Sequence, residues 1–147
     1  MSRPLYFTLD DVTAKVPEAT VTEALDDDRD GLLDDSAWLA VAGAACNEVD
    51  SSLGQRYATP FPATPNTPPL VKHAALLFFW ESLYLRRGFG SKDTNPFLAQ
   101  ADAMRGKLDQ IADGRAPLTP TAEKPRQSVT AVTEPARTSS AAGNLSI

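Results

Sequence analysis

The fold is decided by residues 70–85, which read LVKHAALLFFWESLYL. Apolar side chains extend nearly all the way round this segment, and Pro68 or Pro69 just before it suits the first turn of a helix. A helix that is apolar on nearly all sides is normally the central, buried one. The sequence therefore predicts a helical fold built round residues 70–85, with other helices packed on them.

Three further helices are expected around this central one. Thr8 suits the N-cap of a short helix that Pro17 stops, and a short turn is expected around residues 21–25. Acidic or serine caps at 34–36 precede a second helix that runs to about Tyr57, and Asn95-Pro96 caps another that ends before Gly114. The apolar stripes of these two longer helices follow the helical period: Trp38, Ala42, Ala45, Val49 and Leu53 in one, and Phe97, Ala101, Met104, Leu108 and Ile111 in the other.

The connector before the central helix is expected to be extended, because residues 58–69 contain five prolines. No convincing strand pattern occurs along the chain. We therefore predict an all-α fold, a small bundle of about four helices with an extended C-terminal arm.

Composition excludes several classes of site. The 147 residues include one cysteine, Cys46, and one histidine, His73, which leaves no disulfide framework, Cys-rich zinc site or histidine metal cluster. We expect Cys46 to be a small buried residue, and His73 to be a core or interface residue without a catalytic role. The N-terminus lacks a signal peptide's apolar stretch, and the longest apolar run, 74–80, is far short of the roughly 20 residues of a membrane span. We expect a soluble, non-enzymatic domain with no membrane partner.

Charge and aromatic content divide the chain in two. Residues 1–114 carry ten Lys and Arg against seventeen Asp and Glu, whereas residues 115–147 carry four against two. All eleven aromatic residues lie at or before Phe97, and Pro, Thr, Ser and Ala dominate after Gly114. The sequence therefore predicts a helical domain over 1–114 and an extended, low-complexity arm over 115–147 that becomes ordered on a partner. The acidic balance argues against a dedicated nucleic-acid surface.

An acidic loop between the first helices comes close to the pattern of a calcium loop. Asp26, Asp28, Asp30 and Asp34 occupy loop positions one, three, five and nine, and Gly31 stands at the turn position six. Position twelve, where a bidentate glutamate belongs, is Ala37. We therefore predict a calcium site of weak affinity at these four aspartates, with an acidic loop that only caps the next helix as the alternative.

An ordered set of short motifs gives the chain a resemblance to a known family. The set runs from the Thr8-Leu9-Asp10-Asp11-Val12 opening through the Asp-rich loop to a helix ending VDSSLGQRY at residues 49–57. Pro60, the Pro-Pro-Leu start at residues 68–70 and the IADG at residues 111–114 complete it, and Leu118 closes it. Over about residues 5–118 the chain resembles the small helical head-to-tail connector (adaptor) proteins of tailed phages, of the Mu-like type. It departs from them at Phe97, where the family often has tyrosine, and in its long C-terminal segment.

The resemblance implies a non-enzymatic structural protein of the virion neck, made in the cytoplasm of the bacterial host. Its implied partners are the portal protein, neighbouring copies of itself in a dodecameric ring, a tail or stopper protein, and DNA that passes through the lumen without specific binding. We expect the acidic loop to place negative charge near that channel, and residues 115–147 to run along the portal or a neighbouring copy. The alternatives are a calcium-dependent helical binding module and a tail-completion or stopper ring protein.

Overall fold

The computed structural model describes residues 3–90 and 93–118, and this part of the chain is all-helical. Its five helices are α1 (Leu9–Thr13), α2 (Glu18–Ala24), α3 (Asp35–Leu53), α4 (Pro69–Arg86) and α5 (Leu98–Ala112). No strand occurs among the described residues. The predicted all-α class is confirmed, with one helix more than expected.

The additional helix is α2, where the sequence predicted only a turn. It begins after Pro17, and Glu18 in its first turn favours the positive end of the helix dipole. Val21 and Leu25 are fully buried and Ala24 nearly so. Seven residues are too few to show a helical period in the sequence. A helix of this length is also unstable in isolation, and packing against the core stabilises it.

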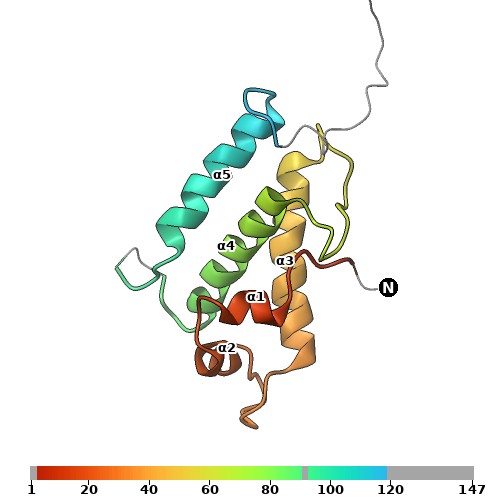
Figure 1. Cartoon of the computed structure of the whole chain (residues 1–147). Coiled ribbons are helices and arrows are strands. Elements are labelled where there is room, and N and C mark those ends of the chain that lie inside the picture. Colours follow the sequence, from red (N-terminus) through yellow and green to blue (C-terminus); the bar gives the residue numbers. More distant parts are fainter. Residues whose placement is uncertain (1–2, 91–92, 119–147) are drawn as a thin grey trace, which may run out of the picture.

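Helix α4 is the centre of the bundle, as predicted. Helices α1, α2, α3 and α5 all pack against it, with α3 and α5 on its two flanks and α2 near the end at which α4 finishes (Figure 1). Helix α1 crosses α4 nearer its middle, where Asp11 pairs with Lys72 and Trp80 donates to the carbonyl of Val12. Every residue from Ala74 to Glu81 is buried. The helix is not covered on all sides, however, because His73 and Leu85 are exposed. Of the two options expected for His73, the core is therefore wrong, and a place at an interface stays a prediction.

The two longer outer helices bury the predicted stripes. All five positions of the α5 stripe are buried, and so are four of the five on α3, with Trp38 partly buried. The small side chains of Ala42, Ala45 and Cys46 are 3% exposed or less and let α4 approach closely. The ring of Phe79 lies 5.1 Å from that of Trp38 and 5.2 Å from that of Phe7, centroid to centroid, which joins the N-terminal segment to α3 and α4.

Helix ends agree with the sequence in part. Thr8 and Asp11 form a reciprocal capping box at α1, and Gly114 takes the left-handed conformation after α5 (φ +81°). Asn95 is not the N-cap of α5; the N-cap is Phe97. The side-chain amide of Asn95 instead stabilises the turn before α5, because it donates to the carbonyl of Glu81 and accepts from the N–H of Phe97.

Segments outside the helices pack on the same core. Residues 58–68 form a non-helical connector, as predicted, in which the peptide bonds before Pro60 and Pro65 are cis. The chain after α5 continues along the body to Leu118, which is 7% exposed and donates its N–H to the hydroxyl of Tyr57. Residues 119–147 lie outside the described residues, so the predicted arm stays a prediction.

Candidate functional site

The acidic loop between α2 and α3 is held by its own aspartates. The carboxylate of Asp26 accepts hydrogen bonds from the backbone N–H groups of Asp30 and Gly31, at 3.0 and 2.8 Å. Asp34, the N-cap residue of α3, turns its carboxylate back over the loop and accepts from the N–H of Asp27 at 2.7 Å. The loop is therefore a closed turn in which side-chain carboxylates accept the backbone hydrogen bonds that carbonyl groups would accept in a helix or sheet.

The four predicted metal ligands come together in this turn. Asp26, Asp28, Asp30 and Asp34 each offer a carboxylate oxygen, and these four oxygens all lie within 4.8 Å of one another. Gly31 supplies the turn in a left-handed conformation, at φ +82°. Clustered carboxylate oxygens are the ligands that calcium prefers. Position twelve of the loop pattern, Ala37, is buried in α3 at 5% exposure and adds no ligand.

The pKa values of two aspartates in the loop shift in opposite directions. Desolvation and the close carboxylates of Asp30 and Asp26 raise the pKa of Asp28. Desolvation acts in the same direction on Asp26, but hydrogen bonds from the N–H groups of Gly31 and Asp30 outweigh it and lower the pKa of Asp26. The loop thus contains like charges that repel, which a bound cation or high ionic strength relieves.

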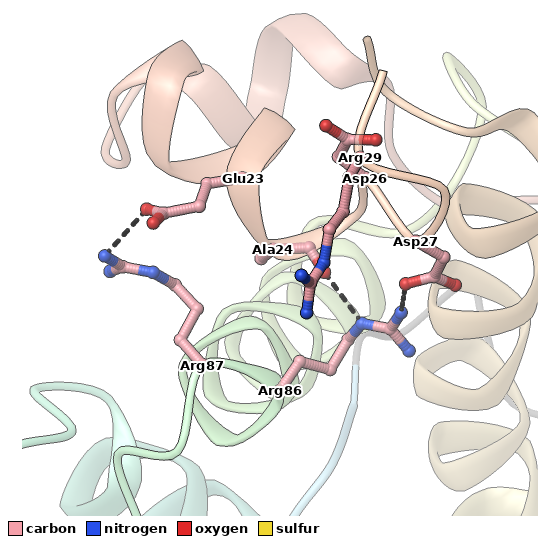
Figure 2. Close-up of a pocket in the computed structure, with 7 residues that line it drawn as sticks. All are labelled: Glu23, Ala24, Asp26, Asp27, Arg29, Arg86 and Arg87. Carbon is pink, nitrogen blue, oxygen red and sulfur yellow. Dashed lines mark hydrogen bonds and ion pairs between the residues drawn. The ribbon is translucent and has the colours of Figure 1, made fainter. Parts of the chain in front are cut away.

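Beside the loop lies a pocket of about 530 Å³ that we call the arginine pocket. It is formed where the end of α4 meets the end of α2 and the start of the acidic loop (Figure 2). Its lining residues are Glu23, Ala24, Asp26, Asp27, Arg29, Arg86 and Arg87.

Two of its arginines have partners inside the pocket. Arg86 donates from Nε to the carbonyl oxygen of Ala24 at 2.9 Å and pairs with Asp27, and Arg87 pairs with Glu23 at 2.9 Å. These contacts fasten the acidic loop and α2 to the end of the central helix.

The lone histidine and cysteine lie away from this site and form no catalytic set. His73 is exposed near the start of α4, and partial desolvation together with the positive charges of Lys15 and Lys107 lowers its pKa. Cys46 is buried as predicted, and burial raises the pKa of its thiol, which is the opposite of nucleophile activation.

One comparison with known proteins decides the family. A family model described as Bacteriophage Mu, Gp36 matches residues 6–134, which is most of the chain. The chain belongs to the bacteriophage Mu Gp36 family. No curated protein matches the chain significantly.

Membership in the bacteriophage Mu Gp36 family bears out the Mu-like phage part of the resemblance. It indicates a phage structural or morphogenesis protein that is associated with the virion. Among the described residues no helix has the length and hydropathy to cross a bilayer. The matched region also includes part of the C-terminal segment whose structure is not described.

Sequence reasoning located the acidic loop of this Gp36-family chain but missed the arginine pocket. Spacing alone places four aspartates on one loop, because the turn is local. The sequence shows Arg86 and Arg87 only as residues at the end of a predicted helix. Their neighbours in the sequence give no indication that they pair with Asp27 and Glu23, about sixty residues away. The one signal available was the density of arginine at a helix end opposite an acidic stretch.

Proposed function

We propose that this protein is a head-to-tail connector (adaptor) of a Mu-like tailed phage. Copies form a ring beneath the portal in the virion neck, join the capsid to the tail and continue the DNA channel, and they carry out no chemistry. The observation that carries the proposal is the family match over residues 6–134. The small helical body and the exposed carboxylates of its acidic loop support it.

The acidic loop fits a channel through which DNA must slide. Asp28 and Asp30 are exposed and form no ion pair among the described residues, whereas Asp27 pairs with Arg86 and Arg29 is the one basic residue of the loop. Four aspartates at 26, 28, 30 and 34 therefore outweigh the single arginine. A phosphate backbone is repelled by such a surface and is not held by it. We infer that this loop faces the lumen, so that DNA passes without specific binding.

Electron microscopy of particles tests the proposal. A reconstruction of virions should show the chain as a ring of helical copies in contact with the portal, with residues 26–34 toward the lumen. Phage lacking the protein should give DNA-filled heads and free tails that do not join. If the protein were located in the tail, or if particles without it were normal, the proposal would be overturned. If its ring contacted a separate adaptor ring and not the portal, the protein would be a stopper or tail-completion protein instead.

A calcium-dependent binding module is the second candidate, favoured by the four carboxylate oxygens within 4.8 Å of one another. Ala37 argues against tight binding, since the loop lacks the bidentate ligand. Calorimetry with calcium separates the two: stoichiometric, tight binding that alters helicity would favour the module.

A further inference from the structure

Arg29 has no hydrogen-bond or ion-pair partner among the described residues. Among the described residues, 3–90 and 93–118, the other arginines bond to a carboxylate or a carbonyl oxygen, whereas Arg29 makes no hydrogen bond or ion pair. Its backbone lies in the left-handed region, at φ +61°, and it is the one described residue other than glycine with a positive φ. A side chain held in this way by the loop, but not used by the fold, is a candidate for an external contact.

The side chain of Arg29 lies in the arginine pocket. Figure 2 shows it running from the loop toward the end of α4 and away from its neighbour Asp26, whose carboxylate bonds to the loop backbone. The pocket therefore contains three guanidinium groups, and the carboxylates of Asp27 and Glu23 pair with two of them. The third guanidinium lacks an anion, and the planar fork of an arginine fits a carboxylate with two hydrogen bonds.

The surroundings favour a single carboxylate over a nucleic acid. A DNA strand that approached Arg29 would bring a row of phosphates against the exposed aspartates of the loop, whereas one acidic side chain enters the pocket alone. Arginine is enriched in protein interfaces, where a buried carboxylate pairs with its guanidinium.

We propose that the arginine pocket receives an acidic side chain of a second copy of this chain, in a head-to-tail contact. This inference rests on the proposed ring, whose neighbouring copies must meet through two different surfaces. The described body supplies candidate anions, because it contains exposed carboxylates that form no ion pair with another described residue, among them Asp10, Glu18, Asp35 and Asp109. Arg29 and one of these carboxylates then pair between copies.

Sedimentation velocity of the purified full chain tests this contact. The wild type is compared over a wide concentration range, at low and high salt, with Arg29→Ala, Arg29→Glu and the matched control Arg115→Glu. Arg115 is also exposed, but it pairs with Asp113 outside the pocket. Because Arg29 makes no hydrogen bond or ion pair with another described residue, its variants should keep the thermal midpoint of the wild type. We expect Arg29→Glu to weaken self-association about tenfold or more, with Arg115→Glu close to the wild type.

A charge swap identifies the partner. Asp10, Glu18, Asp35 and Asp109 are each replaced by lysine in the Arg29→Glu background, and the correct pair should regain most of the lost association. A wild type that stays monomeric, an Arg29→Glu variant that associates normally, or equal weakening by the Arg115→Glu control would each overturn the proposal. None of these results touches the adaptor assignment, which depends on the ring seen in particles.

Discussion

Arg105 holds three helices together, and its removal should destabilise the bundle strongly. From α5 its guanidinium bonds to Glu81 on α4 at 2.5 Å and to Glu48 on α3 at 2.6 Å, and it lies 4.9 Å from the ring centre of Phe78. Hydrogen bonds to Glu81 and then to Glu48 raise the pKa of Arg105 further above its already high value. The guanidinium is therefore always charged.

The cost follows from the burial of the partner carboxylate. The side chain of Glu81 is only 6% exposed, so Arg105→Met leaves a buried charge without its cation but retains an apolar contact with Phe78. Breaking a buried ion pair costs about 3–5 kcal/mol, and the lower end applies because Arg105 itself is 34% exposed. We expect a loss of about 3 kcal/mol in the free energy of unfolding. The thermal midpoint should fall by about 10 °C.

Urea denaturation at neutral pH measures this loss. The matched control is Arg115→Met. Arg115 pairs with Asp113, and their side chains are 65% and 62% exposed, so the loss of this pair should lower the free energy of unfolding by less than about 0.5 kcal/mol. Replacing both partners, Arg105→Met with Glu81→Met, should recover much of the stability, because no uncompensated charge then remains at position 81. If the single variant lost less than about 1 kcal/mol, or if the double variant were no more stable than the single one, the buried-charge explanation would be refuted.

Three further changes test the local structure and the loop. Tyr6→Phe removes a hydroxyl that donates to a carboxylate at 2.6 Å and accepts the buried N–H of Phe61 at 2.9 Å, so urea denaturation should show a loss of about 2 kcal/mol, with Tyr84→Phe as the control. Thr8→Ala removes the capping box of α1 and should cost about 1 kcal/mol in the same assay, with no change in the denaturant slope. Calorimetry with calcium should find a dissociation constant of about 0.1–1 mM, since the loop lacks its twelfth ligand. That affinity should weaken as the pH falls, because the raised pKa of Asp28 means that its carboxylate is protonated before that of Asp26, whose pKa is lowered, and a protonated carboxyl is a poor ligand. Binding that is tighter at acid pH would contradict this assignment.

The parts of the fold that are local in the sequence could be predicted from it. Apolar residues at helical spacing located α3, α4 and α5, and the buried stripes confirm that these periods report on the core. Helix α2 could not be recognised, because seven residues span only about two turns, too few to establish a period. The core option for His73 failed for a different reason. The prediction that α4 is buried came from the apolar character of the helix as a whole. The exposure of a single side chain such as that of His73 depends on whether a neighbouring helix covers it.

Contacts between distant residues could not be predicted at all. The pairing of Arg105 with Glu81 joins two helices through charged side chains, and an isolated sequence offers many equivalent charge pairs. The arginine pocket depends in the same way on the end of α4 meeting the end of α2. The candidate metal cluster is the opposite case, because its four aspartates lie within nine residues and their spacing alone places them on one turn.

The way the acidic loop is held bears on the choice between the two proposed functions. Backbone N–H groups already bond to the carboxylates of Asp26 and Asp34, and the N–H of Asp34 itself bonds to the carbonyl of Leu25 at 3.0 Å. Arg86 fastens the loop to α4 from the other side through Asp27. A loop stabilised by these contacts keeps its shape without a cation, so calcium would add charge neutralisation and little new structure. A calcium-triggered module needs an element that changes conformation on binding. The fixed, negatively charged loop therefore supports the proposed adaptor role over the calcium-dependent module.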